Sequence, residues 1–464
     1  MVAAGAGARV TLAESVRTGG DCLWTGCVPS KSLIAAAEMA QRIRESGRLG
    51  IDAGEPRVDF ERVMAHVDAA RARIAPHDSP ERLRAEGVEV IEAAARFCGP
   101  GRIDLGGRGL TYRTAIIATG SRPALPPIEG LAEAHPLTSD NVWDLRELPR
   151  NLVVLGGGPI GCELGQAFAR LGSEVTLIEA SDRLLPREEP EVAALVADRL
   201  RAENVDVRLG AAATAVRAGG ETTEVEVESA TGKQSITCDR LLVATGRRPT
   251  TSRLGLNAVG VETTESGAVV VNSRLRTTAP RVYAAGDVTA AYPFTHVAAY
   301  HARVASLNAL FGLRNRVDYR AVPRVTFTDP EVASVGMSEL QARDRWGARA
   351  RTVGHDLANL DRAIAADRLH GFAKLVGDPH GKLVGATVVG PAAGESIAEL
   401  SARIAAGDGI GSVSTAVHAY PTFTESAARA ADDYQRERYA TPRVRALTRP
   451  LLAVLRLLDR SGRR

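Results

Sequence analysis

The sequence predicts an α/β fold in which two domains of similar type follow one another along the chain. Two short apolar segments share an ending: "TAIIATGSRP" (114–123) and "RLLVATGRRP" (240–249) are each expected to form a buried strand followed by Ala-Thr-Gly. A third segment, "TTAPRVYAAGDVT" (277–289), is a strand that leads into Gly-Asp. The matching halves indicate two nucleotide-binding domains in tandem, and 464 residues are enough for two to four domains.

The most specific pattern is "NLVVLGGGPIGCELGQAFARLGSEVTLIEA" (151–180). An apolar strand runs into Gly156-x-Gly158-x-x-Gly161, a helical stretch follows, and a second apolar strand ends in Glu179. This order and spacing are those of a dinucleotide-binding βαβ unit, with a βαβ unit that binds no nucleotide as the alternative. The three glycines permit the tight turn, admit the pyrophosphate and allow close helix–strand packing. Glu179 can accept hydrogen bonds from an adenosine ribose and repels a 2′-phosphate, which favours NADH over NADPH.

The overall composition argues against two classes of partner. Apolar residues make up 45% of the chain and charged residues 24%, as in ordinary globular proteins. No apolar run approaches the roughly eighteen residues of a membrane helix. The formal net charge of +3 implies no large basic surface for nucleic acid.

Two cysteines near the N-terminus, in "GGDCLWTGCVPSKSLI" (19–34), are candidates for chemistry. A structural disulfide between Cys22 and Cys27 is disfavoured, because closing so short a loop removes little unfolded-state entropy. A zinc site needs a second pair of ligands at suitable spacing, and the sequence has none. A redox-active pair remains, and it needs a cofactor. The other cysteines, which are expected to be small buried hydrophobic residues, are Cys98, Cys162 and Cys238.

Together these segments resemble the flavin-dependent pyridine nucleotide–disulfide oxidoreductases, the family of dihydrolipoamide dehydrogenase, glutathione reductase and mercuric reductase. "VTFTDPEVASVGMSE" (325–339) is similar to the opening of the family's last domain, and "HAYPTFTE" (418–425) to its active-site loop. The resemblance implies tandem Rossmann-like FAD and NAD domains and an α+β C-terminal dimerisation domain. The expected segments are 1–148 and 263–319 for FAD, 149–262 for NAD, 320–440 for dimerisation and 441–464 as a basic tail.

The resemblance implies that Cys22 and Cys27 form a catalytic disulfide. Cys22 would be the thiol that meets the substrate, and Cys27 the thiol beside the flavin. Pro29 suits the first position of a helix, which would place the Cys27 thiolate near the positive end of the helix dipole and lower its pKa. Electrons would pass from NADH through FAD to the disulfide, and on to a small electrophile: a soft metal ion, a quinone or a disulfide.

Further cofactor contacts follow from the same resemblance. Glu14, which ends the strand "VTLAE", matches the acid on the FAD ribose. Lys31 and Glu163 match the ion pair beneath the isoalloxazine ring, and Asp287 matches the acid on the ribityl and pyrophosphate region. The glycine-turn, strand-end and Ala-Thr-Gly residues expected at the two nucleotides are Thr119, Gly120, Gly156, Gly158, Gly161, Glu179, Gly246 and Gly286.

The N-terminus departs from the family pattern. The family begins with a strand, a GxGxxG turn and a helix, whereas this sequence opens with "MVAAGAGARVTLAE". Gly5-Ala6-Gly7 is not that motif, because no strand precedes it and Val10 stands at the third glycine position. We expect a misplaced start or a truncation, since roughly twenty to thirty further residues would complete the βαβ unit that cradles the FAD pyrophosphate. An inactive, FAD-free product is the alternative to an enzyme.

Tyr420 is the second departure. Dihydrolipoamide dehydrogenases and glutathione reductases have histidine directly before the proline, paired with a glutamate that matches Glu425. Histidine, with a pKa near 6.5, suits proton transfer, whereas tyrosine near 10 is a poor base. His418 could share a face with Tyr420 if the loop is extended, or be an ordinary polar histidine. Lipoamide is therefore a disfavoured substrate, and a dihydrolipoamide dehydrogenase that uses His418 is the rival hypothesis.

Mercuric reductases do place tyrosine here, and "GGDCLWTGCVPSK" is most similar to their relatives. Those enzymes pass the metal ion through a C-terminal cysteine pair, but this sequence has no cysteine after Cys238. A soft metal ion would have to load Cys22 and Cys27 directly. We expect a cytoplasmic homodimer of the mercuric-reductase-like branch with no resident metal.

The tail "RPLLAVLRLLDRSGRR" (449–464) has leucines at helical spacing and several arginines. It could touch anionic lipid. The simpler expectation is a terminal helix that is packed on its own domain or frayed.

Overall fold

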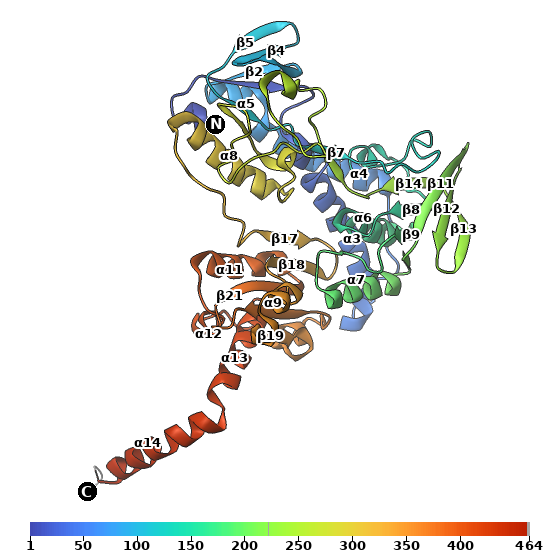
Figure 1. Cartoon of the computed structure of the whole chain (residues 1–464). Helices are drawn as coiled ribbons and strands as arrows, with labels where there is room; N and C mark the ends of the chain where they lie inside the picture. Colours follow the sequence, from blue (N-terminus) through green and yellow to red (C-terminus); the bar gives the residue numbers. More distant parts are fainter. Residues whose placement is uncertain (221, 462–464) are drawn as a thin grey trace. The chain divides into compact units, whose positions relative to one another are not determined.

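The computed structural model describes residues 1–220 and 222–461 (Figure 1). The chain forms two compact units. The first contains Met1–Pro186 and Ala197–Asp318, and the second contains Arg187–Val196 and Tyr319–Arg464.

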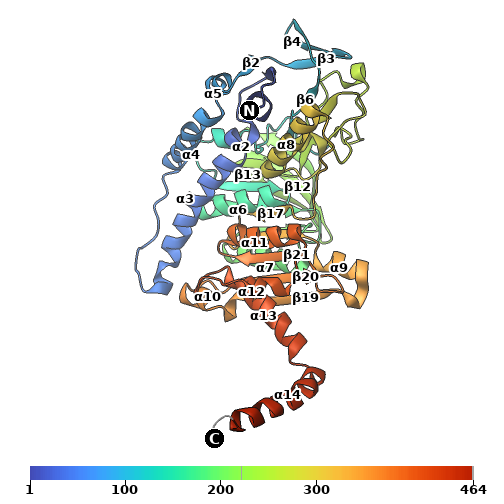
Figure 2. The same cartoon turned by 90° about the vertical axis from the view of Figure 1, so that its left-hand side faces the viewer.

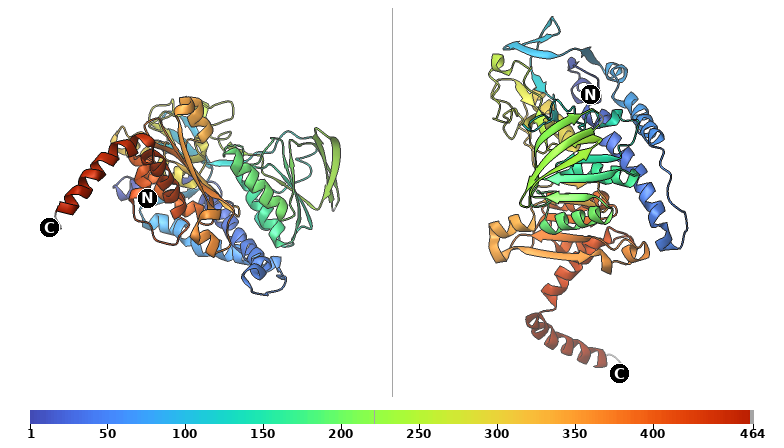
Figure 3. Two further views of the ribbon diagram at one scale, coloured as in Figure 1. Left: turned by 90° about the horizontal axis from the view of Figure 1, so that it is seen from below. Right: turned by 90° about the vertical axis from the view of Figure 1, so that its right-hand side faces the viewer.

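The glycine-rich segment of the first unit folds into a parallel sheet with the strand order β10-β9-β8-β14. Residues 152–155 of β8 are all buried, as expected for a parallel strand covered on both faces. An antiparallel sheet, β11-β12-β13, shares an apolar core with it, which Figure 3 shows in green. The elements are β8 (Asn151–Leu155), α6 (Pro159–Leu171), β9 (Glu174–Glu179), β10 (Asp206–Leu209), β11 (Ala212–Gly219), β12 (Thr222–Ser229), β13 (Gly232–Cys238) and β14 (Arg240–Val243). Helix α7 (Pro190–Ala202) follows β9 in the chain, and its residues 190–196 belong to the second unit.

The remainder of the first unit is built from chain segments that are far apart in sequence. β1 pairs in parallel with β2, and β6 pairs in parallel with β16, which brings residues 115–117 beside residues 282–284. The helices between β1 and β2 are α2 (Gly20–Trp24), α3 (Cys27–Glu45), α4 (Phe60–Ile74) and α5 (Pro80–Ala85). The other elements are α1 (Val2–Gly5), β1 (Val10–Glu14), β2 (Val88–Glu92), β3 (Ala95–Gly99), β4 (Arg102–Leu105), β5 (Arg108–Thr111), β6 (Ala115–Ile117), β16 (Val282–Ala284) and α8 (Thr295–Phe311).

The two Ala-Thr-Gly segments lie side by side. The strands that follow them, β7 (Ser121–Pro123) and β15 (Arg247–Pro249), form an antiparallel pair in which Arg247 is opposite Pro123. Ala124 N–H also donates to the Gly246 carbonyl at 3.0 Å. The two copies of the repeated sequence pattern therefore lie next to each other in the structure.

The second unit is an antiparallel sheet with the strand order β17-β18-β21-β20-β19 (Figure 2). Apolar side chains of α11 and α13 share one core with the central strands, including the buried residues Leu375, Ile397 and Leu400. The elements are β17 (Pro323–Thr326), β18 (Glu331–Gly336), α9 (Glu339–Trp346), β19 (Arg351–Asp356), α10 (Asp361–Ala365), β20 (Phe372–Gly377), β21 (Leu383–Gly390), α11 (Ala393–Ala406), α12 (Gly411–Thr415), α13 (Glu425–Tyr439) and α14 (Pro442–Ser461).

Across the described part of the chain, every helix falls short of the length and apolar character needed to cross a membrane.

Candidate functional site

Cys22 and Cys27 lie on either side of a tight turn between two helices. Cys22 belongs to α2, and Cys27 is the first residue of α3. The N–H groups of Thr25 and Gly26 both donate to the Asp21 carbonyl, at 2.8 and 2.5 Å, which closes the turn. A side chain at Gly26 would not fit, because its Cβ would lie 2.9 Å from that carbonyl oxygen. Both cysteines are free thiols, and their side chains hydrogen-bond to each other.

The two thiols have opposite acid–base character. The hydrogen bond from Cys22 lowers the pKa of Cys27 to about 5, against the opposing effect of partial desolvation. Thr295 and the positive charge of Lys31 lower the pKa of Cys27 further. Cys27 also begins a 19-residue helix, and the positive end of the helix dipole stabilises a negative charge there. The hydrogen bond with Cys27, together with burial, raises the pKa of Cys22. At neutral pH Cys27 is therefore the thiolate and Cys22 the protonated thiol.

The helix start differs from the sequence-based expectation. α3 begins at Cys27 rather than at Pro29, which occupies the third helical position. Pro29 is still compatible with the first turn, because the N–H groups there have no partner within the helix.

Lys31 and Glu163 form an ion pair, with 2.9 Å between Nζ and Oε2. Lys31 lies one turn after Cys27 on α3, and Glu163 lies on α6, directly after the glycine turn. The Glu163 side chain is 8% exposed and that of Lys31 is 35% exposed. The pair therefore joins the helix of the thiolate to the helix of the dinucleotide motif.

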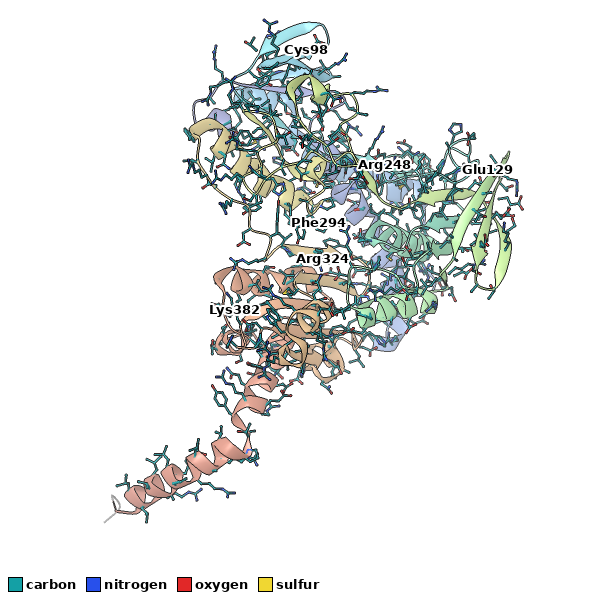
Figure 4. All side chains as sticks on the ribbon, viewed as in Figure 1. Cys98, Glu129, Arg248, Phe294, Arg324 and Lys382 are labelled. Carbon is teal, nitrogen blue, oxygen red and sulfur yellow. The ribbon has the colours of Figure 1, made fainter. Side chains whose placement is uncertain are left out.

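Thr295 is a functional candidate that sequence reasoning missed. Its Oγ1 lies 3.5 Å from the Cys27 Sγ. Thr295 is the first residue of α8, after the N-cap residue Phe294, which is labelled in Figure 4. A single threonine 268 positions away from the cysteine has no local pattern that could have indicated this contact.

A second missed feature is the Asp21–Arg247 ion pair next to Cys22. Arg247 also donates to the hydroxyl groups of Ser121 at 2.8 Å and Ser139 at 3.1 Å. Ser121 in turn donates to Asp287 Oδ2 at 3.0 Å. This network connects α2 to the β7–β15 pair. Burial raises the pKa of Asp21, and Arg247 opposes that shift.

The glycine turn after β8 fits a dinucleotide. A Cβ at Gly156 would lie 2.7 Å from the Ala244 carbonyl oxygen, and one at Gly161 would lie 1.9 Å from that of Gly156. A Cβ at Gly158 would meet nothing, so this is the open side of the turn. No side chain caps the start of α6, which leaves its first N–H groups available to an anion. Glu179 accepts from Gly157 N–H at 2.6 Å and lies at the rim of this turn.

The carboxyl ends of β1 and β2 fit the nucleotide end of a second cofactor. Glu14 is the last residue of β1, is in register with Glu92, and accepts from Val16 N–H at 2.9 Å. A cavity of about 470 Å³ opens there, lined by Arg17, Trp24 and Glu92 among others. Ligands of parallel α/β sheets bind outside the carboxyl ends of the strands.

The other expected nucleotide contacts lie at strand ends and turns of the first unit. The hydroxyl of Thr119 donates to the carbonyl of Thr250, the residue after β15, at 2.6 Å and so joins the first Ala-Thr-Gly turn to the end of β15. Gly120, Gly246 and Gly286 have φ values of 65°, 139° and 77°, a region that favours glycine. The structure thus brings the thiols, Lys31, Glu163, Asp287 and both Ala-Thr-Gly turns into one unit.

The predicted active-site loop belongs to the second unit, and its polar residues contact different groups. His418 Nε2 lies 2.9 Å from Glu399 Oε2, and its Nδ1 lies 3.0 Å from the Ala416 carbonyl oxygen. Burial favours a raised pKa for Glu399, but hydrogen bonds from His418 and Arg403 hold it below its usual value.

Tyr420 and Glu425 also have separate partners. The Tyr420 hydroxyl donates to Asp361 Oδ2 at 2.8 Å, and this bond raises the pKa of the phenol. Glu425 is the first residue of α13 and accepts from Thr422 N–H at 3.2 Å. It lines a polar cavity of about 300 Å³ together with Asp361 and Arg429.

Of the three remaining cysteines, Cys162 and Cys238 are buried as expected, but Cys98 is exposed. Cys98 lies on β3 in the small sheet β3-β4-β5 (Figure 4), next to Phe97, which faces the core. Alternation along the strand therefore turns Cys98 outward.

Comparison with known proteins matches both units. The family described as "Pyridine nucleotide-disulphide oxidoreductase" matches residues 1–302, and its dimerisation domain matches residues 322–431. A mercuric reductase of Streptomyces lividans is 38% identical over 435 residues, covering 92% of this chain and 91% of the relative. A dihydrolipoyl dehydrogenase of Geobacillus stearothermophilus is 35% identical over 435 residues, covering 93% and 92%.

Two solved structures are also similar. LpdA from Mycobacterium tuberculosis superposes with a TM-score of 0.84 at 28% identity, covering 93% of this chain and 96% of that one. The Cu(II) complex of the HOCl-induced flavoprotein disulfide reductase RclA from Escherichia coli gives 0.80 at 29% identity, covering 92% and 94%.

Proposed function

Because this chain belongs to the pyridine nucleotide–disulphide oxidoreductases, a family that binds FAD and NAD(P), we propose that it transfers electrons from NADH to a Cys22–Cys27 disulfide and on to a small electrophilic acceptor. The polarised thiol pair carries the proposal: a Cys27 thiolate at the start of α3, beside a Cys22 thiol that keeps its proton. FAD, when bound, supplies the hydride acceptor for NADH and the electron pair for the disulfide.

Three residues of this chain, Cys27, Cys22 and Lys31, have distinct roles in the proposed reaction. Cys27 holds negative charge at neutral pH, stabilised by Cys22, Thr295 and Lys31. Cys22 presents a thiol that can bond to an electrophile once its proton leaves. Lys31 is fixed by Glu163, so its charge stays one turn from the thiolate. Residues of α2, α3 and α8 thus stabilise the Cys27 thiolate, and Glu163 on α6 holds Lys31 in place.

NADH is the proposed donor because of Glu179. Its carboxylate lies beside the glycine turn, held by the N–H groups of Gly157 and Ser181 at 2.6 and 2.7 Å. A fixed negative charge there favours ribose hydroxyls and repels a 2′-phosphate.

A soft metal ion is the favoured acceptor, with quinones and disulfides as the other members of the class. Thiolates prefer soft metals, and mercuric reductases are among the relatives. Two-electron reduction of a divalent ion by NADH yields NAD⁺, the metal and one proton. Both ring nitrogens of His418 are already engaged, one by Glu399 and one by the Ala416 carbonyl, and Tyr420 has a raised pKa, so neither favours the proton transfer that a disulfide substrate needs. We propose that the protein works in the cytoplasm as a homodimer through its dimerisation domain.

The test is NADH oxidation by purified protein supplied with FAD, followed without oxygen, with Hg(II), menadione or lipoamide as acceptor. Hg(II) should give the highest rate, and NADH should outperform NADPH. Cys22→Ser and Cys27→Ser should each lower the Hg(II)-dependent rate by at least about a hundredfold. Cys98→Ser is the matched control and should leave the rate unchanged, since Cys98 is an exposed cysteine outside the site. A Cys22→Ser enzyme with the full Hg(II)-dependent rate, or a preference for NADPH, would contradict the proposal.

A further inference from the structure

The C-terminal helix α14 carries a surface that neither the thiol pair nor the nucleotide sites use. Leu447, Leu451, Leu455 and Leu458 recur at intervals of four and three residues and so share one face of the helix. Their side chains are between 49% and 78% exposed. In Figures 1 and 2, α14 (red) extends away from the sheet of its unit. The expected packing of this tail on its own domain is therefore not observed.

The side of α14 away from the leucines is basic. Arg445, Arg449 and Arg456 are spaced by four and seven residues, which places them on one face roughly opposite the leucine stripe. Among the described residues, none of the three forms a salt bridge. Residues 442–464 contain seven arginines and one aspartate, a formal charge of +6. The whole chain carries +3, so the remaining residues sum to −3.

This combination points to one kind of partner. Leu452 and Leu457 lie outside the leucine stripe, but the arginines gather on one side of the helix and the other side is apolar. Such a helix fits a surface in which an anionic layer covers an apolar layer. Nucleic acid offers the charge but gives the leucines nothing to bury against. A second copy of this helix would cover the leucines but would leave the arginines, on the other face, without an anionic partner. An anionic phospholipid surface satisfies both faces.

We propose that α14 is an amphipathic anchor that lies in the plane of a membrane rich in anionic phospholipid. The leucine stripe enters the region below the headgroups, and the arginines remain level with the lipid phosphates. Pro450 lies inside the helix and lacks the N–H that would bond to the Ala446 carbonyl, so the isolated helix is marginal in water. Burial of the leucine face in lipid would stabilise the helix at the membrane surface.

Sedimentation of the full-length protein with vesicles tests the anchor. Vesicles of phosphatidylcholine with one quarter phosphatidylglycerol should bind the protein at least about tenfold more strongly than pure phosphatidylcholine, and added salt should weaken binding. Replacing Arg445, Arg449 and Arg456 together with Gln should weaken it on the order of a hundredfold. The double variant Leu451→Glu, Leu455→Glu should abolish it.

A charge-matched control uses three exposed arginines elsewhere: Arg314→Gln, Arg316→Gln and Arg349→Gln in one protein. This variant should bind anionic vesicles like the wild type, and all variants should retain NADH oxidation. The proposal fails if the wild type stays in solution with both vesicle types, or if the control loses as much affinity as the α14 variant. It also fails if the leucine variant changes the oligomeric state without lipid binding in the wild type, which would make a second copy the partner.

Discussion

At the scale of single residues, the polarity of the thiol pair is the central property of the site. The same hydrogen bond stabilises Cys27 as thiolate and Cys22 as thiol, so the two side chains act as one unit. The sequence predicted the pair and the helix behind it, because both are local patterns. Thr295 and Arg247 could not be predicted, since they reach α3 and α2 from more than 200 residues away.

Removing the Thr295 hydroxyl should weaken the thiolate. In Thr295→Val the pKa of Cys27 should rise from about 5, by up to roughly one unit, because a hydrogen bond to a charged group is lost. The pH dependence of Cys27 alkylation by iodoacetamide in the reduced protein measures this midpoint, and the raised pKa of Cys22 keeps the two reactions apart. Thr295→Ser keeps a hydroxyl and should behave like the wild type. An unchanged midpoint in Thr295→Val would show that the 3.5 Å contact does not stabilise the thiolate.

At the scale of elements, helix α8 serves two sites at once. Its first residue, Thr295, contacts the thiolate, and two turns later the fully buried His301 accepts from Gly286 N–H at 3.2 Å. Gly286 precedes Asp287, the acid that Ser121 contacts. One rigid helix therefore fixes the thiolate environment relative to the Gly-Asp turn.

The buried His301 should make the fold sensitive to acid. Burial lowers the pKa of His301, with Asp287 opposing the shift, so the unfolded chain binds the proton more readily than the folded one. The free energy of unfolding should then fall as the pH drops below about 6.5, by at most about 1.4 kcal/mol per pH unit from this group. Urea unfolding at pH 7.5 and 5.0 measures it. His301→Asn keeps an acceptor near the Gly286 N–H and should show a flatter pH dependence. Equal slopes in both proteins would assign the acid sensitivity to other groups.

At the scale of the whole molecule, the predicted α/β fold with its dimerisation domain is confirmed. The repeated Ala-Thr-Gly endings and the glycine turn predicted the tandem nucleotide-binding domains, because parallel α/β folds repeat one local pattern. The dimerisation domain followed from the family resemblance of residues 325–339 and 418–425. The contacts of the C-terminal loop could not be predicted in the same way. Sequence reasoning provided no partner for His418 or Tyr420, and the structure supplies Glu399 from α11 and Asp361 from α10. Such pairings depend on how distant elements pack, which no local pattern encodes.

The identity of residue 420 should decide whether disulfides are substrates. Tyr420→His introduces a side chain that titrates near neutral pH, so lipoamide turnover should rise by roughly a hundredfold or more. His418→Ala is the matched control and should barely change any rate, because Glu399 and the Ala416 carbonyl already occupy the ring nitrogens. A wild type that is fast on lipoamide and silenced by His418→Ala would instead identify a dihydrolipoamide dehydrogenase.

The β7–β15 pair has a consequence for how this protein can be re-engineered. The chain leaves β7 at Pro123 and returns at Arg247 directly opposite, so residues 124–246 form an insertion whose two ends are neighbours. A segment with adjacent ends can be exchanged as a cassette without stretching the host domain. Cys22, Cys27 and Lys31 stay with the host, but Glu163, the partner of Lys31, travels with the cassette. A transplanted dinucleotide module must therefore bring its own carboxylate at that position, or it leaves the lysine beside the redox thiols unanchored.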